Sequence, residues 1–290
     1  LQALSRARIL LDESNMNQNV QEALESQAKE SLKNIRVALI VVDYQNDFVD
    51  GSLAIGNGDA SEDPAARIAN VNRLIQLPFD TVVITKDWHP SDHISFLSAA
   101  RNADRTLADE FANREIALFE KVQFTQPKRK QVLYPSHCVQ NTVGAELAPG
   151  LNVPSDVIIV NKGLESLVDS YSAFMDNEGD KKSELHAVLE DAHVDAVVVC
   201  GLAYDICVFH TTKDAANLGF YCATARDASA ALTVDGIKNA SAYFEANLVK
   251  EMVTDEIVEM MATREFPDEW AQKVIERVKG THNNNGAVEN

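Results

Sequence analysis

Short runs of β-branched and other apolar residues recur along the chain and mark candidate strands. They are Val37–Val42, Thr81–Thr85, Val157–Val160, Ala196–Cys200 and Tyr221–Ala225, with a sixth candidate at Glu251–Thr254. Because these runs are continuously apolar rather than alternating, we expect strands that are buried on both faces. Helical patterns lie between them, over Asp63–Gln76, Ser183–Leu189, Val208–Leu218 and Val234–Asn247. The alternation predicts an α/β fold, a three-layer doubly wound sheet of about six mainly parallel strands with helices on both faces.

The two ends of the chain lack this pattern. Residues 1–34 show a polar helical pattern with scattered apolar positions, and residues 256–290 predict a C-terminal helical extension that ends in a flexible tail. The tail, GTHNNNGAVEN from Gly280, has few apolar residues with which to pack. We therefore expect one core domain over residues 35–255 with an extension at each end.

Charge and composition exclude several classes of function. The 290 residues include 44 Asp and Glu against 26 Lys and Arg, a net charge of -18, which disfavours nucleic acid and anionic membranes as partners. No apolar run approaches the roughly 18 residues of a membrane span, and no signal-peptide pattern or glycine-rich nucleotide-binding loop occurs. The four cysteines include no CxxC pair. A reducing compartment is expected, the cytoplasm first, with the nucleus and the peroxisome as alternatives.

Three reactive side chains follow predicted strands, at the sheet edge where α/β proteins bind ligands. Asp43 follows the first strand, Lys162 the third and Cys207 the fourth. Cys207 falls in the first turn of the next predicted helix, where we expect the helix N-terminus to lower the pKa of the thiol. Alone, Asp43 could cap a helix and Lys162 could be an ordinary surface residue. Together they supply an acid/base, a charge partner and a nucleophile. Core packing better explains the other cysteines, Cys138, Cys200 and Cys222.

A metal site is the second candidate feature. Asp87 and His89 stand two residues apart in extended chain, so both side chains point the same way and can bind one ion, although Asp-x-His alone is a weak signal. His137, beside a proline-fixed turn, could complete a site of two histidines and one carboxylate with open positions. His93 is a further candidate, either as a ligand or as a hydrogen-bonding partner of one.

Five segments in order resemble the nicotinamidase/pyrazinamidase family of isochorismatase-like cysteine hydrolases. They are VVDYQNDFVDGSLAIGNGD, TKDWHPSDHISF, YPSHCVQNTVGAEL, NKGLESLVDSYSAF and GLAYDICVFHTTKDA, and the resemblance covers roughly residues 35–255. It implies that this span is an isochorismatase-like hydrolase domain. It also implies two residue sets, a catalytic triad of Asp43, Lys162 and Cys207 and metal ligands Asp87, His89 and His137. One divalent metal ion is implied, with Zn²⁺ as the expected one.

The resemblance implies further site residues. An oxyanion hole would be formed by the backbone N–H groups of Ala203 and Cys207, with a cis peptide between Leu202 and Ala203. Phe48 matches a family position that packs against a pyridine ring. Other candidate pocket walls are Trp88, Tyr134 and Tyr171. Family members often have Trp at the position of Tyr134, so the shape of this pocket is expected to depart from theirs.

The implied activity is hydrolysis of nicotinamide to nicotinate and ammonia through a cysteine thioester, as a step of NAD salvage. Pyrazinamide would be a second substrate, and a homo-oligomer is a further expectation. The nearest alternative is a sister amidase acting on a carbamoyl, maleamate or ureido substrate with the same Asp/Lys/Cys machinery. Isochorismatase itself does not use a nucleophilic Cys at the position of Cys207. An interaction protein with a lapsed catalytic core is a third possibility, but no triad member is missing.

Overall fold

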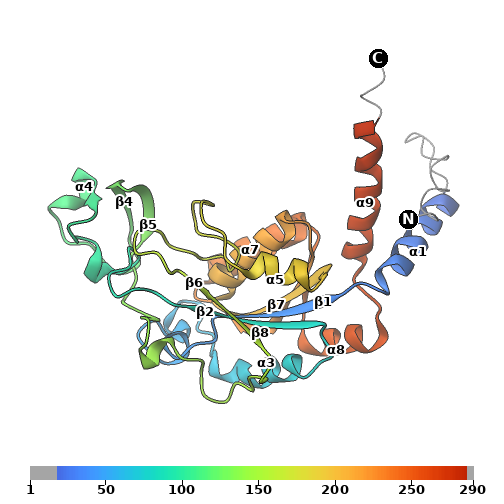
Figure 1. The fold of residues 1–290 in the computed structure, drawn as a ribbon, viewed down its shortest axis with the longest axis horizontal. Coiled ribbons are helices and arrows are strands. Elements are labelled where there is room, and N and C mark those ends of the chain that lie inside the picture. The colour runs from blue at the N-terminus through green and yellow to red at the C-terminus, as the bar shows by residue number, and fades with distance from the viewer. Residues whose placement is uncertain (1–17, 286–290) are drawn as a thin grey trace.

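A six-stranded parallel sheet forms the centre of the computed structural model, which describes residues 18–285 (Figure 1). The strands lie in the order β6-β2-β1-β7-β8-β9, and each neighbouring pair is parallel. In chain order they are β1 (Val37–Val42), β2 (Thr81–Asp87), β6 (Ile158–Lys162), β7 (Ala196–Leu202), β8 (Tyr221–Ala230) and β9 (Val249–Met252). The predicted doubly wound fold is confirmed.

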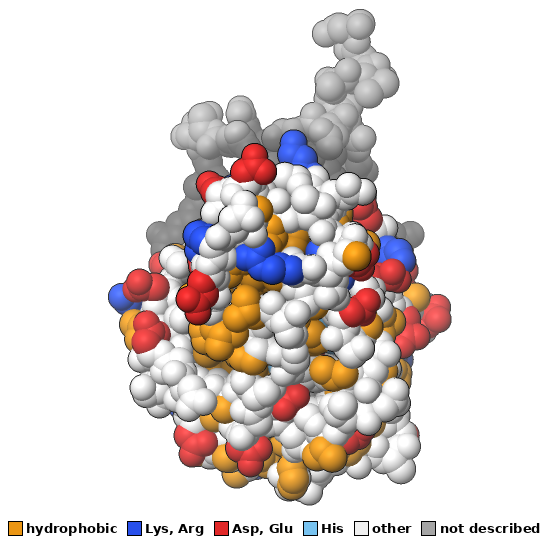
Figure 2. Space-filling view, turned by 90° about the vertical axis from the view of Figure 1, so that its left-hand side faces the viewer, with side chains coloured by type: hydrophobic (Ala, Val, Ile, Leu, Met, Phe, Trp, Pro, Cys, Tyr) orange, Lys and Arg blue, Asp and Glu red, His pale blue; other side chains and the backbone are white. Residues whose placement is uncertain are grey.

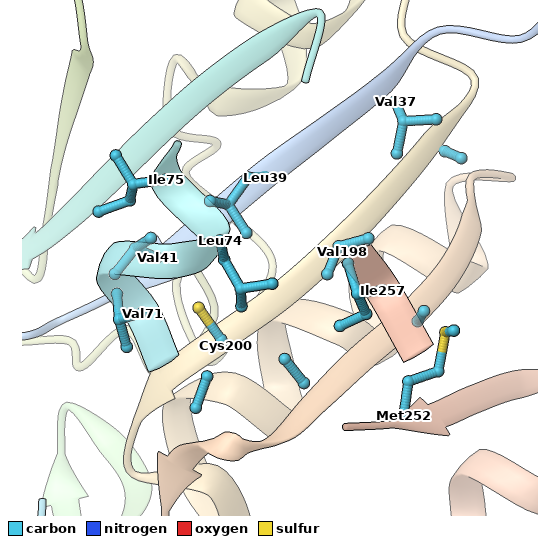
Figure 3. Close-up of a cluster of buried hydrophobic side chains, with 14 of the residues drawn as sticks. Val37, Leu39, Val41, Val71, Leu74, Ile75, Val198, Cys200, Met252 and Ile257 are labelled. Carbon is cyan, nitrogen blue, oxygen red and sulfur yellow. The ribbon is translucent and has the colours of Figure 1, made fainter. Parts of the chain in front are cut away.

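Helices cover both faces of this sheet. One face packs against α1 (Gln18–Leu32), α3 (Ile68–Ile75), α8 (Thr254–Thr263) and α9 (Asp268–Asn285). The other packs against α5 (Leu185–Asp191), α6 (Phe209–Asn217) and α7 (Val234–Ala246). Successive strand residues point to opposite faces of the sheet. Leu39 and Val198 point to the face that is covered by α3 and α8 (Figure 3), whereas Ile40 belongs to the core on the other face. Full burial of each such side chain stabilises the fold by about 1.5–3 kcal/mol.

A small antiparallel sheet, which the sequence pattern did not predict, forms a lobe at one end of the molecule. Its strands are β3 (Thr106–Leu107), β4 (Lys121–Gln126) and β5 (Lys128–Val132), with α4 (Asp109–Ala112) beside them. Only one face of the β4–β5 hairpin is apolar, through residues such as Val122 and Phe124, and the rest is polar. The pattern was missed because the apolar positions are few and widely spaced.

The remaining short elements lie in the connections. They are α2 (Asn46–Val49), the 3₁₀ turns Ile55–Asn57, Ala65–Arg67, Leu97–Ala99 and Val143–Ala145, and a π-helical turn at Tyr204–Val208. No helix within residues 18–285 is both long enough and apolar enough to cross a membrane.

Several predicted boundaries differ from the structure. The helix predicted over Asp63–Gln76 is a 3₁₀ turn followed by α3, and the last strand ends at Met252 because Thr254 already begins α8. Helix α9 spans Asp268–Asn285 and so includes Gly280 and the next five residues, which were expected to belong to a flexible tail. The predictions for residues 1–17 and 286–290 lie outside the described residues.

Helix α9 is part of the core rather than a separate appendage. Its Trp270 is fully buried and donates a hydrogen bond from Nε1 to the carbonyl of Cys222 in β8, at 2.9 Å. Helix α1 packs against α9, and Lys29 pairs with Asp268 at 2.6 Å. Both helices rise from the same end of the molecule (Figure 1).

Candidate active site

Three reactive side chains meet beyond the carboxyl ends of β1, β6 and β7. Asp43 follows β1, Lys162 ends β6, and Cys207 lies on the turn after β7. Strands β1 and β7 are neighbours in the sheet at the point where the chain order reverses, which is where open α/β sheets bind ligands. Lys162 Nζ lies 2.9 Å from Asp43 Oδ2 and 3.6 Å from Cys207 Sγ. The structure therefore brings the three predicted residues into one buried cluster.

The ammonium group of Lys162 is the electrostatic centre of this cluster. Besides Asp43 Oδ2, its Nζ lies 2.5 Å from Asp87 Oδ1 and 2.9 Å from the carbonyl oxygen of Ser170. An ammonium group has three protons to donate, and they go here to Asp87 Oδ1, the carbonyl of Ser170 and Cys207 Sγ, while Asp43 Oδ2 lies at ion-pair distance. Burial alone would lower the pKa of Lys162, but the two carboxylates raise it well above its usual value. Lys162 is therefore charged at neutral pH.

The acid and the thiol both have raised pKa values. Burial raises the pKa of Asp43 to about 6, against the opposing charge of Lys162. Burial also raises the pKa of the Cys207 thiol well above its usual value, although Lys162 opposes the shift. The predicted lowering of the thiol pKa is thus wrong, because desolvation outweighs the helix N-terminus and the nearby ammonium. Cys207 needs a base to remove its proton, and Asp43 has a pKa suited to that task.

Cys207 lies on the π-helical turn Tyr204–Val208, which leads directly into α6. The turn is anchored to Ala203, whose carbonyl accepts hydrogen bonds from the N–H groups of Ile206 and Val208, both at 3.1 Å. The peptide between Leu202 and Ala203 is cis, as the resemblance implied. The two hydrogen bonds to its carbonyl place the Ala203 backbone at the start of the turn that carries Cys207.

Beside this cluster, Asp87, His89 and His137 form a second group. Strand β2 ends at Asp87, and His89 follows two residues later on the same side of the extended chain. Asp87 Oδ2 lies 3.4 Å from His89 Nε2 and 4.0 Å from His137 Nε2. All three side chains are buried, and one donor atom from each lies within 4.8 Å of the others.

The donor set fits a divalent metal ion. His89 Nδ1 lies 2.9 Å from the carbonyl of Gly163, and His137 Nδ1 lies 2.8 Å from that of Pro135, so both Nδ1 atoms donate protons. These bonds leave the Nε2 atoms free to face Asp87, as metal-binding histidines require. Burial lowers the pKa of His137 to about 4. Burial opposes ionisation of Asp87, but the positive charges of Lys162 and His89 outweigh it and lower the pKa of this carboxyl. A neutral His137 imidazole and an ionised Asp87 carboxylate are protonation states that a metal ion needs. Burial alone would lower the pKa of His89, but Asp87 raises it above its usual value, so this imidazole would give up its proton on binding the ion.

Comparisons with known proteins agree with this arrangement. Residues 37–256 match the isochorismatase domain. A nicotinamidase of Acinetobacter baylyi is 38% identical over 200 residues, which are 69% of this chain and 83% of that protein.

The chain belongs to the isochorismatase domain family.

Two solved members of the family bear on the site. The structure of a nicotinamidase of Acinetobacter baumanii is 32% identical, covers 77% of this chain and 98% of its own, and superposes with a TM-score of 0.66. A pyrazinamidase of Pyrococcus horikoshii in complex with zinc is 28% identical, covers 75% of this chain and 99% of its own, and has a TM-score of 0.57. Together with the Acinetobacter baylyi enzyme, they place this isochorismatase-family chain in the nicotinamidase/pyrazinamidase group, as the sequence motifs predicted.

The two residue groups of this isochorismatase-family protein face one small cavity. Its lining includes Cys207, the predicted nucleophile, and two members of the metal group, Asp87 and His137. The other lining residues are mainly apolar or aromatic, namely Phe48, Leu53, Ile55, Tyr134, Asp169, Tyr171, Ala203, Ile206 and Leu232. Three of the four predicted aromatic walls therefore lie at the cavity.

Trp88, the fourth predicted wall, does not line the cavity. It stands between Asp87 and His89 on an extended chain, so its side chain points the opposite way from theirs. Its ring lies instead beside Lys86, whose Nζ is 4.4 Å from the ring centroid. The expectation of Trp88 as a substrate wall is not supported by this placement.

His93 lies against the metal group rather than among the three ligands. Its ring stacks on that of His89 with centroids 4.0 Å apart, and its Nδ1 lies 2.7 Å from Ser95 Oγ. His93 Nε2 lies 3.2 Å from the carbonyl of Val168. Of the two roles considered from the sequence, this arrangement favours support of a ligand.

Asp169 is the main cavity residue that the sequence pattern did not reveal. Its carboxylate is buried, and it accepts hydrogen bonds from Gln131 Nε2 and from the N–H of Ser170, both at 2.8 Å. Asp169 comes from a segment without regular secondary structure, and Gln131 belongs to the unpredicted hairpin. The only available signal was its place in the NKGLESLVDSYSAF segment, seven residues after Lys162.

Proposed function

We propose that this chain is a nicotinamidase, which hydrolyses nicotinamide to nicotinate and ammonia and also accepts pyrazinamide. The observation that carries the proposal is the single cavity that joins Cys207 to Asp87 and His137 between aromatic walls. A flat aromatic ring fits between such walls, and its carboxamide can reach the thiol while a ring nitrogen faces the metal group. Nicotinamide carries both features.

The chemistry follows from the residues around the thiol. Asp43 removes the proton of Cys207, and Sγ attacks the carboxamide carbon to form a tetrahedral oxyanion. Backbone N–H groups of Ala203 and Cys207 would bind this oxyanion; the loss of one such donor typically costs about 10²- to 10³-fold in rate. The C–N bond then breaks as Asp43 returns the proton to the nitrogen, which releases ammonia and leaves a thioester.

Water completes the cycle. Asp43 takes a proton from a water molecule that attacks the thioester carbon, and the second tetrahedral species collapses to nicotinate and the Cys207 thiolate, which Asp43 reprotonates. Throughout, Lys162 stays within reach of both Asp43 and Cys207 and stabilises the negative charge that passes between them. In the cell, nicotinate formed in this way would enter NAD salvage, and we propose a cytoplasmic location.

We further propose that the divalent ion is Zn²⁺, held by Asp87, His89 and His137. Two imidazole nitrogens and one carboxylate oxygen are ligands that zinc commonly takes, with positions left open for water or substrate. When bound, the ion supplies a Lewis-acid contact for the ring nitrogen and so orients the substrate.

The test of the function is ammonia release from nicotinamide, pyrazinamide and benzamide by the purified protein loaded with zinc. Nicotinamide and pyrazinamide each carry a ring nitrogen meta to the carboxamide, whereas benzamide has a carbon atom at that position. We expect both to be hydrolysed, and benzamide to be hydrolysed at least about 100-fold less efficiently in kcat/KM, since it loses one positioning contact. Hydrolysis of maleamate or a ureido compound without hydrolysis of nicotinamide would instead identify a sister amidase.

Removal of the metal should reduce this activity. Chelation and dialysis are expected to lower ammonia release from nicotinamide by at least about tenfold, and added Zn²⁺ should restore it.

The matched variant is His137→Ala, which should bind less than one zinc per chain when the metal is counted by mass spectrometry. His186→Ala, in α5 outside the cluster, is the control and should keep the metal. Full activity after complete removal of the metal would contradict this role.

A further inference from the structure

The β4–β5 hairpin concentrates positive charge on a strongly acidic chain. Its basic residues are Lys121, Lys128, Arg129 and Lys130, and none of them forms an ion pair with any residue in the described part of the chain. Arg129 is partly buried, and its Nε and Nη1 are enclosed within the molecule, so a partner cannot reach these two donors. The exposed cations of the hairpin are Lys121, Lys128 and Lys130. These three lysines are free to pair with carboxylates of another molecule.

The surface at this end of the molecule carries basic side chains next to apolar ones. Figure 2 views the end where the hairpin lobe lies, and it shows Lys and Arg side chains above an apolar patch, with acidic side chains among them. Exposed apolar residues beside the hairpin include Leu118, with 45% of its surface accessible to solvent, and Phe119, with 51% accessible. The hairpin is thus a protruding basic element next to apolar surface.

An acidic groove lies around α8 and the start of α9. Its lining contains five carboxylates, from Glu256, Glu259, Glu265, Asp268 and Glu269, against one lysine, Lys250. Asp268 and Glu269 are paired with lysines of this chain, whereas Glu259 and Glu265 are exposed and form no ion pair within residues 18–285. The apolar part of the lining comes from Met252, Met260 and Phe266. The groove therefore offers acceptors and apolar contact together.

The hairpin and the groove lie at opposite ends of the long axis of the molecule (Figure 1). One molecule cannot bring them together, but two copies can. We propose that the β4–β5 hairpin of one copy docks in the α8–α9 groove of a second copy, so that the chain associates head to tail. Three exposed, unpaired lysines, Lys121, Lys128 and Lys130, then meet a groove with an excess of carboxylates. Such a contact uses two different surfaces, so it either forms twice in an antiparallel pair or repeats into a ring or an open chain.

The test is sedimentation equilibrium of the full chain at low and high salt. Exposed ion pairs are screened within about 10 Å at 0.1 M salt and about 3 Å at 1 M. We expect concentration-dependent association at low salt that is weakened at least tenfold at high salt. A wild-type chain that stays monomeric at low salt over the whole concentration range would overturn the proposal.

Charge reversal identifies the two surfaces. The double variant Lys128→Glu/Lys130→Glu and the double variant Glu259→Lys/Glu265→Lys should each associate at least tenfold more weakly than wild type. Mixed with each other, they should associate again, because the hairpin of each variant then meets a groove of opposite charge on the other. Lys238→Glu on α7, which reverses an exposed lysine elsewhere, should leave association unchanged.

Folding and activity measurements separate a lost docking contact from a damaged fold. Circular dichroism should show native folding of each variant, and none of the substituted residues lies at the catalytic cavity, so ammonia release should be retained. Loss of association in the hairpin variant alone, or failure of the mixture to restore it, would mean that the α8–α9 groove is not the docking site and would overturn the proposal. The outcome does not depend on which amide the protein hydrolyses.

Discussion

Replacement of Cys207 by alanine should abolish turnover while leaving the fold intact. Ammonia release from nicotinamide is expected to fall by on the order of 10⁴-fold or more, because no other described side chain at the cavity is a nucleophile of comparable reactivity. The substitution removes one sulfur atom from a buried turn and leaves Asp43 and Lys162 paired with each other. Nicotinamide binding, measured by calorimetry on the zinc-loaded variant, should survive.

Cys222→Ala is the matched control, since it removes a second buried thiol from β8, away from the cavity. It should lose some stability and keep the wild-type rate per folded molecule. A Cys207→Ala variant that still releases ammonia at more than a few per cent of the wild-type rate would contradict the role of the thiol. Such a result would leave direct attack by water as the simplest alternative.

Replacement of Lys162 by methionine should be the most destabilising change at the site. Methionine has a similar length but no charge, so Asp43 and Asp87 would both remain buried without their shared counter-ion. Breaking a buried ion pair by removing one partner typically costs about 3–5 kcal/mol. We expect a loss of that size in the free energy of unfolding in urea, together with loss of amidase activity.

A double variant separates the effect on stability from the effect on catalysis. In Lys162→Met/Asp43→Asn, the amide that replaces the Asp43 carboxylate is uncharged, so only Asp87 would remain as a buried carboxylate without a counter-ion. Part of the lost stability should therefore return, while activity stays absent. Lys238→Met, an exposed lysine on α7, should change the free energy of unfolding by less than about 0.5 kcal/mol. A Lys162→Met variant with nearly wild-type stability would show that the surrounding carboxylates are better solvated than their burial indicates.

The central sheet was predictable because its strands are continuously apolar and its helices intervene at regular intervals. Every strand of the parallel sheet was found, because each contains a short apolar run. Asp43, Lys162 and Cys207 could be placed for the same reason: each follows one of those runs. The β4–β5 hairpin escaped because a strand with one solvated face and a proline turn lacks that signature. The expectation that all strands are buried on both faces is wrong for the outer strand β6, where Ile158 and Ile159 are exposed because no strand or helix within residues 18–285 covers them.

The surroundings of the individual site residues could not be predicted from the sequence. The spacing of Asp87 and His89 predicted that both point the same way, and that same alternation turns Trp88 away from the cavity. The thiol pKa failed as a prediction because it depends on how completely Cys207 is buried, which no local pattern reports. Asp169 was missed because its position results from a long loop and a hydrogen bond to Gln131, 38 residues earlier.

Two neighbouring residues at the end of β6, Lys162 and Gly163, contact the two groups of the site. Lys162 supplies the shared cation, and the carbonyl of the next residue, Gly163, accepts the Nδ1 proton of His89. Gly163 has a φ of 66°, and a Cβ at this position would lie 2.3 Å from His89 Cε1, so only glycine lets the backbone approach the imidazole so closely.

Strand β6 is also an outer strand of the parallel sheet, paired only with β2. Its detachment would leave the other five strands joined while separating the cation from both carboxylates and releasing His89 from its acceptor. Local opening of an outer strand costs less free energy than global unfolding. One partial unfolding event would therefore remove Lys162 from the proposed catalytic cluster and release His89 of the proposed metal site, at a lower free-energy cost than global unfolding.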